Sequence, residues 1–257
     1  MAKLKQMRKI LLFTLLFLTC SLSFGQNVET AGFPKTGIDS IYYDGRLKFI
    51  ECYEKGIRTG EWKYYYDNGA LEKSGNYENG KRIGEWKWFD KQGKVTGILN
   101  YDKGISENYY QNGKLKSKGK NVSSLDKYNE TGDFEFYNEF TSNLEAVESL
   151  KNGKQVGKSI TYGSNEEPIE IGNYENGKLN GEYKKYYYNY LQNAEKKYPK
   201  ETLKVKGYFK DGKETGEWNY YYENGKIYLI GTYENGAEIG EWKYYDEKGN
   251  LIKRQNY

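Results

Sequence analysis

From about residue 41 onwards, aromatic and apolar residues alternate with polar ones in short segments. In the segment 61–66, Trp62, Tyr64 and Tyr66 fall on one face, because successive side chains of a strand point to opposite sides of a sheet. No segment after residue 25 shows a sustained helical periodicity. The pattern therefore predicts an all-β chain.

The strand-like segments are separated by Asn-Gly or Asp-Gly pairs. These pairs occur at 44–45, 68–69, 79–80, 112–113, 152–153, 176–177, 211–212, 224–225 and 235–236. Asn and Gly tolerate the positive φ that a two-residue type I′ turn requires at both central positions. We therefore expect antiparallel hairpins joined by type I′ turns at all of these pairs.

The hairpins repeat with a period of about 24 residues. Gly-Glu-Trp or a variant of it recurs at 60–62, 84–86, 132–134, 157–159, 181–183, 216–218 and 240–242. One interval, of 48 residues, contains a shortened copy at Gly104. Such periods are typical of stacked units that each contact their neighbours. We predict an elongated, single-layer antiparallel sheet of about 16–18 strands, about 80 Å long and twisted or curled.

This organisation divides the chain into three parts. Residues 1–25 are predicted to be a signal peptide, 26–40 a lead-in, and 41–257 one solenoid-like repeat array. Within the array the segment 105–181 is degenerate, with Ser106 and Ser159 in the position of Trp62. The copy that starts at Glu182 gains eleven residues, in a loop at 189–199. We interpret both features as drift in a tolerant array; a bend or recognition segment is the alternative.

The N-terminus has the pattern of an export signal. Basic residues between Lys3 and Lys9 precede an apolar run, 10–18, and small residues at 23 and 25 precede the expected cut after Gly25. The apolar run is too short to cross a bilayer core of about 30 Å. Lipid attachment at Cys20 is a second alternative, although the preceding residues fit a lipobox poorly. We expect a protein of the periplasm, cell surface or medium, in which Cys52 forms no internal disulfide.

Charge and composition exclude several classes of function. The chain has 40 Lys and Arg against 36 Asp and Glu, and four of the basic residues lie in the leader, so the remainder (40 − 4 = 36) is neutral. That balance disfavours nucleic acid and membrane lipid as partners. The absence of histidine excludes His-based acid–base and nucleophilic catalysis and every His-containing metal site. We expect no catalytic residue, no metal and no cofactor.

The aromatic residues of the repeat motif are the first candidate site. They form a stripe of Trp62, Tyr64, Trp86, Trp88, Trp218, Tyr220, Trp242 and Tyr244. We interpret the stripe as rings that stack across strands, because the sheet has no other obvious core. The alternative is an open platform for sugar rings or an extended peptide. Structural turn and repeat glycines accompany the stripe at Gly60, Gly69, Gly80, Gly84, Gly216, Gly225, Gly236 and Gly240.

A row of acids is the second candidate. It comprises Glu61, Glu85, Asp133, Glu182, Glu217 and Glu241. Paired carboxylates serve glycoside hydrolysis. However, a basic residue usually follows each acid two positions later, on the same face, and the row recurs with the repeat instead of forming one special pair. We therefore expect a solvated ladder of opposite charges.

The repeat resembles a known family. Tyr77-x-x-Gly80-x-x-x-Gly84-x-Trp86, and the same spacing from Tyr233 to Trp242, resemble the MORN repeat. The extended form Gly-Glu-Trp-Lys-Tyr-Tyr-x-x-Asn-Gly resembles its bacterial variant, whose members are often catalogued as antitoxin-like. The resemblance covers about residues 41–257. It implies single-layer hairpin arrays used as scaffolds or for protein interaction, and no active-site residues.

Two functions from different classes follow from these observations. The first is a non-enzymatic, exported repeat scaffold that binds an unknown protein or peptide partner, with an antitoxin or immunity-like role as one form. The second is binding of glycan or cell wall through exposed Trp and Tyr. The sequence gives neither the identity of the partner nor the oligomeric state.

Overall fold

The computed structural model describes residues 35–124, 130–188 and 201–257. The predicted signal peptide, the possible lipidation residue Cys20 and the 189–199 loop therefore lie outside the described residues. The described residues contain 20 strands and no helix, and every strand pair is antiparallel. None of them forms a helix suited to spanning a membrane. The predicted all-β fold is confirmed.

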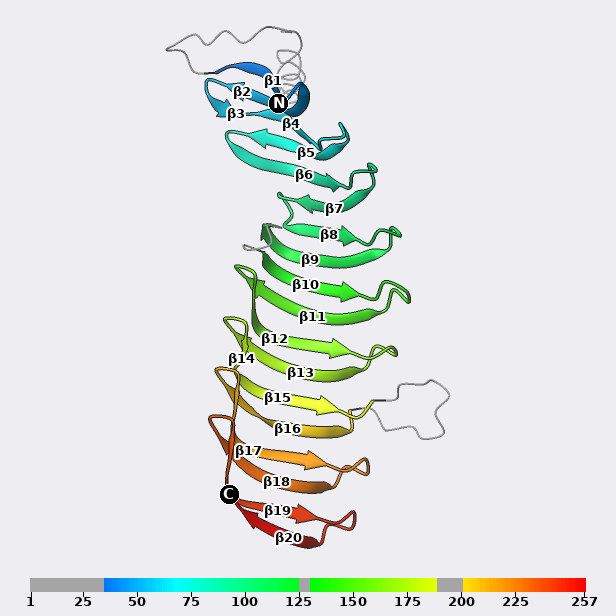
Figure 1. The fold of residues 1–257 in the computed structure, drawn as a ribbon, viewed down its shortest axis with the longest axis vertical. Helices are drawn as coiled ribbons and strands as arrows, with labels where there is room; N and C mark the ends of the chain where they lie inside the picture. Colours follow the sequence, from blue (N-terminus) through cyan, green and yellow to red (C-terminus); the bar gives the residue numbers. More distant parts are fainter. Residues whose placement is uncertain (1–34, 125–129, 189–200) are drawn as a thin grey trace, which may run out of the picture. The chain divides into compact units, whose positions relative to one another are not determined.

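The chain divides into two compact units, which we describe separately: residues 1–103 and 104–257. The strands of unit 1 are β1 (Gly37–Tyr43), β2 (Arg46–Glu54), β3 (Ile57–Arg58), β4 (Gly60–Tyr65), β5 (Leu71–Glu78), β6 (Lys81–Phe89) and β7 (Val95–Asn100). They form a meander in chain order, in which both β3 and β4 pair with β2 (Figure 1). The first strand begins at Gly37, inside the segment predicted as a lead-in.

Unit 2 is a meander of the same kind. Its strands are β8 (Ile105–Tyr109), β9 (Leu115–Ser124), β10 (Thr131–Tyr137), β11 (Leu144–Lys151), β12 (Lys154–Tyr162), β13 (Pro168–Glu175), β14 (Lys178–Leu179), β15 (Gly181–Tyr186), β16 (Leu203–Lys210), β17 (Lys213–Tyr221), β18 (Ile227–Glu234), β19 (Ala237–Tyr245) and β20 (Leu251–Asn256). Twenty strands are found where 16–18 were expected, partly because β3/β4 and β14/β15 each split one segment in two.

Two kinds of turn alternate along the chain, and the prediction of a single kind was wrong. At Asn79-Gly80 both residues have positive φ, 49° and 77°, as a type I′ turn requires. At Asn68-Gly69 only the glycine does, with φ 82°. The amide of Gly69 donates to the carbonyl of Tyr66, and Tyr66 N–H donates to the carbonyl of Ala70. This is a three-residue loop, a type I turn followed by a left-handed glycine.

The same three-residue loop recurs at the other two pairs that lack the double positive φ, 112–113 and 224–225. In the loop at 68–69 the Asn68 side chain, not its backbone conformation, carries the role of asparagine. Its Oδ1 accepts from the amide of Ala70 at 3.1 Å, and its Nδ2 donates to the carbonyl of Lys91, one repeat further on, at 2.9 Å. The dipeptide therefore serves two different turns, which the sequence pattern alone does not separate.

A bulge places three of the tryptophans over a glycine of the neighbouring strand. In the β5–β6 pair, Ser74 faces Lys87 and Asn76 faces Ile83, so the single residue Gly75 faces the three residues 84–86. A Cβ on Gly75 would lie 2.2 Å from the Trp86 indole. The same close fit joins Gly207 to Trp218 and Gly231 to Trp242, at 2.2 and 2.1 Å. At these three places the residue beneath the indole must therefore have no side chain.

The tryptophans that cover these glycines lie, together with other aromatic rings, in a row within each unit, which we call the inner row. In unit 1 the centroid distances are 5.3 Å for Tyr53–Trp62, 4.9 Å for Trp62–Tyr77, 5.2 Å for Tyr77–Trp86 and 6.4 Å for Trp86–Tyr101. In unit 2 they are 5.1 Å for Phe209–Trp218, 5.7 Å for Trp218–Tyr233, 5.1 Å for Tyr233–Trp242 and 5.7 Å for Trp242–Tyr257. Most of these pairs meet edge to face, a favoured geometry for aromatic rings.

A second set of contacts ties successive repeats together at their turns. The hydroxyl of Tyr66 donates to the carbonyl of Phe89 at 2.7 Å. Equivalent bonds run from Tyr110 to Tyr137, from Tyr187 to Tyr221 and from Tyr222 to Tyr245, at 2.7–2.8 Å. Each bond satisfies a backbone carbonyl in the following repeat. Through this bond the last Tyr of the motif therefore connects successive repeats, not the two strands of its own hairpin.

The fit of indole to glycine predicts a specific coupling between two mutations. Gly75→Ala should destabilise the protein by about 1–3 kcal/mol, because its methyl group overlaps the Trp86 ring. Trp86→Ala should cost about 3–5 kcal/mol, because the ring is completely buried. In the Trp86→Ala background, Gly75→Ala should cost less than about 0.5 kcal/mol.

Chemical denaturation of all four proteins measures this cycle. Ser74→Ala, at the neighbouring position on the opposite face, is the control and should be close to neutral. Additive losses from Gly75→Ala and Trp86→Ala would show that the two side chains do not compete for the same space.

The bond between repeats at Tyr66 predicts a smaller effect. Tyr66→Phe removes the hydroxyl that reaches the Phe89 carbonyl and should lower the free energy of unfolding by about 0.5–1.5 kcal/mol. Hydrogen exchange should also quicken at the turn of the next repeat. Tyr65→Phe is the matched control, and equal losses in the two variants would contradict a specific role for the Tyr66 bond.

Candidate aromatic binding face

Each unit has two faces of different chemistry. One carries the inner row of rings, and we call it the aromatic face. The other carries the predicted row of acids, and we call it the charged face. The division follows from strand alternation: Trp62 and Tyr64 of β4 point to one side, Glu61 and Lys63 to the other.

The tryptophans of the predicted stripe lie in the inner row and are covered. Their exposed fractions are 1% for Trp62, 0% for Trp86, 4% for Trp218 and 2% for Trp242. In unit 1 the indole N–H groups of Trp62 and Trp86 donate to the carbonyls of Cys52 and Asn76, both at 3.1 Å. Those of Trp218 and Trp242 are buried and have no acceptor among the described residues. These rings are therefore core residues in both units.

The remaining members of the stripe, Tyr64, Trp88, Tyr220 and Tyr244, are half-buried on the same face. We call them the outer column. The ammonium group of Lys73 lies 4.3 Å from the Tyr64 ring centroid, and that of Lys253 lies 5.0 Å from the Tyr244 ring. Such contacts hold a cation beside a partly open aromatic surface. The outer column is therefore the part of the stripe that a binding partner can reach.

Two arginines of unit 1 lie over the inner row, and sequence analysis missed them. The Arg58 guanidinium lies 5.0 Å from the Trp62 ring and 5.5 Å from the Tyr77 ring. That of Arg82 lies 4.6 Å from Trp86 and donates to the Tyr101 hydroxyl at 2.7 Å. Their common spacing, two residues before the repeat glycines Gly60 and Gly84, was the signal available in the sequence.

The acids of the second candidate form the expected charge ladder. Nitrogen–oxygen distances are 2.8 Å for Lys63–Glu61, 3.6 Å for Lys87–Glu85, 2.7 Å for Lys184–Glu182 and 3.6 Å for Lys243–Glu241. Glu217 accepts from Asn219 at 2.9 Å. A hydrogen bond from the Ser149 hydroxyl holds the pKa of Asp133 below its usual value. These groups are solvated and satisfied by neighbours, and exposed pairs of this kind contribute little to stability.

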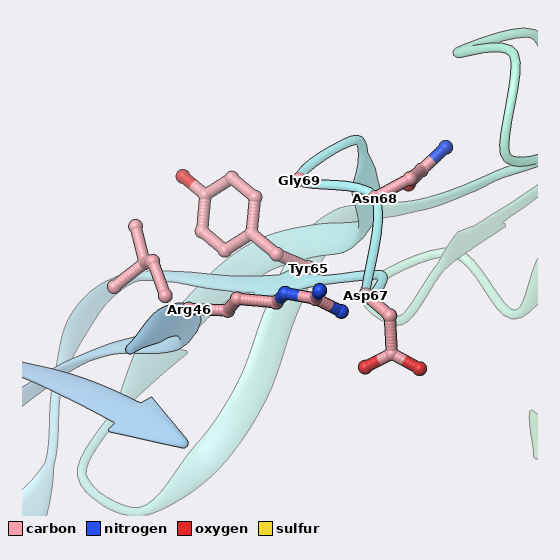
Figure 2. A pocket seen from close by; sticks show the side chains of 6 residues that line it. Arg46, Tyr65, Asp67, Asn68 and Gly69 are labelled. Atoms are coloured by element: carbon pink, nitrogen blue, oxygen red, sulfur yellow. The ribbon is translucent and has the colours of Figure 1, made fainter. Parts of the chain in front are cut away.

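Two hollows in the described surface recur with the repeat. One, of about 350 Å³, is lined by Arg46, Leu47 and Tyr65 beside the turn of Asp67, Asn68 and Gly69 (Figure 2). A second, also of about 350 Å³, lies at the same place in a later repeat, beside Asn224 and Gly225. Their recurrence reflects the geometry of the three-residue loop. No group of three or more His, Cys, Asp or Glu side chains within the described residues could hold a metal ion.

The predicted glycines lie at positions that need their backbone freedom. Gly60, Gly69, Gly80, Gly84, Gly216, Gly225, Gly236 and Gly240 all have positive φ. At Gly84, with φ 59°, the left-handed conformation forms the bulge that carries Trp86 over Gly75. The thiol-bearing Cys52 is 3% exposed and lies next to Gly60.

Comparison with known families identifies the repeat. The family described as "MORN repeat variant" matches residues 58–79, 82–103, 102–120, 214–235 and 238–257. The chain contains repeats of the MORN repeat variant family. The matched MORN repeats include all four buried Trp residues and the whole outer column.

The other comparisons add little. No curated protein matches the chain. A solved structure described as "Crystal structure of GtfA/B complex bound to UDP and GlcNAc" shares 14% sequence identity, with a TM-score of 0.21. The match covers 51% of this chain and 26% of that chain. A likeness at this TM-score carries no argument about fold or function.

Burial of the outer column predicts an alkaline sensitivity. Desolvation, assisted by nearby Tyr77 and Glu51, raises the pKa of Tyr64 from its ordinary value of 10.0 to about 12. The folded state therefore retains a proton that the unfolded chain loses above pH 10. This contribution to stability is complete below pH 10 and is lost as the pH rises through about 12.

Tyr64→Phe should therefore flatten the fall in unfolding free energy between pH 10 and 12, measured by denaturation at fixed pH values. The variant should also remove one late-ionising phenol from the ultraviolet titration. An unchanged alkaline slope would show that the Tyr64 hydroxyl is solvated in the folded protein.

Proposed function

We propose that this MORN-repeat scaffold is an exported, non-enzymatic protein that binds a protein or peptide partner through its aromatic face. The observation that carries the proposal is the outer column. Tyr64, Trp88, Tyr220 and Tyr244 are half-buried, so their positions are held by packing while part of each ring is open to solvent. Rigid aromatic surface of this kind is used in protein recognition because little side-chain freedom is lost on binding.

The repeat supplies this surface in an ordered arrangement. The inner row and the bonds between turns hold each outer ring to its neighbours, as Trp62 does for Tyr64 at a centroid distance of 6.3 Å. Lysines beside Tyr64 and Tyr244 add donors that suit backbone carbonyls and carboxylates of a peptide. The export part of the proposal rests on the leader sequence 1–25. An immunity-like role toward an exported toxin is one form that such binding takes.

The glycan alternative has less support from the aromatic face. Stacking of sugar rings needs the open face of an aromatic side chain, and indole offers the largest one. Four of the five tryptophans are at most 4% exposed, which leaves Trp88 as the half-buried exception. Glycan binding would thus depend on one indole and the tyrosines of the outer column.

Site-specific photo-crosslinking tests the proposed surface. The chain from Gln26 would carry benzoyl-phenylalanine at position 64, on the aromatic face, and in a matched control at position 63, on the charged face. With envelope extract of the source organism, we expect a discrete protein adduct from position 64 and none from position 63. Adducts of equal yield from both positions, or none from position 64 under any growth condition, would contradict the proposal.

Two further readouts address the alternative. Soluble glycans should leave the tryptophan fluorescence unchanged, and insoluble wall polymer should not retain the protein. Retention that is lost in Trp88→Ala would favour glycan binding over the protein partner.

A further inference from the structure

One position of the repeat carries a charged residue beside the inner row in two repeats of each unit. It is the residue that lies directly across the sheet from the ring preceding each tryptophan, and we call it the cross-row position. In unit 1 these pairs are Arg58 with Tyr53 and Arg82 with Tyr77. Residues directly opposite in an antiparallel pair share a face, and both guanidinium groups lie over inner-row rings.

The last two repeats of unit 2 carry the opposite charge at this position. Glu214 pairs with Phe209, and Glu238 pairs with Tyr233, in the same register as the arginines. Burial raises the pKa of Tyr220, and Glu214 adds to that shift; a hydrogen bond with Tyr244 raises the pKa of Tyr257, to which Glu238 also contributes. These carboxylates therefore stand beside the rings of their own repeats, as the arginines do in unit 1.

The two pairs match in spacing and in accessibility. Arg58 and Arg82 are 24 residues apart, and so are Glu214 and Glu238, which is one repeat in each unit. Arg58 and Glu238 are exposed, and Arg82 and Glu214 are half-buried. None of the four forms an ion pair within the described parts of the chain. Each unit thus presents two like charges, one repeat apart, over similar aromatic surface.

We propose that the aromatic face of unit 1 binds the aromatic face of the last two repeats of unit 2 in a second copy of this chain. The inference rests on the proposed use of the aromatic face for protein binding and names one partner for it. Both halves of the contact are present in one sequence: a cationic pair over rings and an anionic pair over rings with the same spacing. An acidic segment of an unrelated protein would match only the first half.

Charge gives this contact its orientation. Two such sheets packed face to face lie about 10 Å apart, which places cross-row side chains of opposite charge within reach of each other. The outer columns of the two copies would supply the apolar contact. Unit 1 against unit 1 would oppose arginines, and the last repeats against themselves would oppose glutamates, so like-charge repulsion disfavours both. Because the charges are near the surface, association should weaken as salt is raised.

Charge reversal at the two exposed positions tests the proposal. The chain from Gln26 should self-associate in sedimentation velocity at low salt. Arg58→Glu alone and Glu238→Arg alone should each raise the dissociation constant by about tenfold or more, because each homodimer then opposes like charges. Lys87→Glu, on the charged face of unit 1, is the matched control and should associate as the unaltered protein does.

Mixing the two variants provides the decisive measurement. A mixture of Arg58→Glu and Glu238→Arg chains should form a mixed dimer of near-original affinity. In one contact, Arg58 of the second variant faces Glu238 of the first, as in the unaltered protein. In the other contact, the two substituted positions face each other with their charges exchanged. Circular dichroism spectra that match the unaltered protein would show that both variants fold.

Three results would overturn the inference: an unaltered chain that stays monomeric, reversals with no effect, or a mixture that fails to associate. A monomer that still gives the specific adduct from position 64 would leave the proposed function intact. Loss of that adduct in Arg58→Glu, with a monomeric chain, would identify an acidic segment of another protein as the occupant instead. Self-association with no extract adduct would support the inference and count against a separate protein partner.

Discussion

The indoles of Trp86, Trp218 and Trp242 rest on the backbone of the neighbouring strand, and they do so because that strand has a glycine beneath each of them. The contact of Trp86 with Gly75 leaves no space for a methyl group, and those of Trp218 and Trp242 with their glycines are equally close. A single-layer sheet has no second layer to cover its apolar side chains, so large rings must lie flat along their own sheet to be buried. The bulge that starts at Gly84 makes this possible, and the inner row of rings follows from it.

At two places in the chain both partners of this fit are replaced. We call the position of Gly75 in β5 the glycine register and that of Trp86 in the following strand the tryptophan register. In β7 the glycine register is occupied by Leu99, and the next copy of the motif has Ser106 in the tryptophan register. In β11 it is occupied by Glu148, and the next copy has Ser159. The degenerate centre therefore follows the same constraint as the regular repeats at the two ends of the array. Small residues stand where a ring would have no glycine to pack against. At β2, Glu51 occupies the register although Trp62 follows, and its carboxylate accepts from the Tyr53 hydroxyl instead.

Much of this architecture is readable from the sequence, because period, alternation and turn residues are local signals. The all-β meander, the aromatic row and the ladder of Glu61 and Lys63 follow from them. The two turn types cannot be read from the sequence, because Asn68-Gly69 and Asn79-Gly80 are the same dipeptide. They differ only in the number of residues in the hairpin loop. The role of Gly75 was also missed, because a glycine inside a strand has no side chain to contribute to a pattern. Its recurrence two positions before a tyrosine or phenylalanine, at Gly207 and Gly231 as well, was the available clue.

The proposed function depends on this packing. Rings that are packed against a glycine cannot serve as an open platform, whereas a partner can contact the outer column and the cross-row charges. The most direct measurement is the chemical shift of the Gly75, Gly207 and Gly231 Hα protons in solution. An indole lying over the glycine backbone should move one Hα of each residue strongly upfield through its ring current, and Gly45, with no side chain near its Cβ position, should show no such shift. Ordinary shifts at Gly75, Gly207 and Gly231 would show that the tryptophans do not rest on the glycines, and would remove the physical basis of the structure described above.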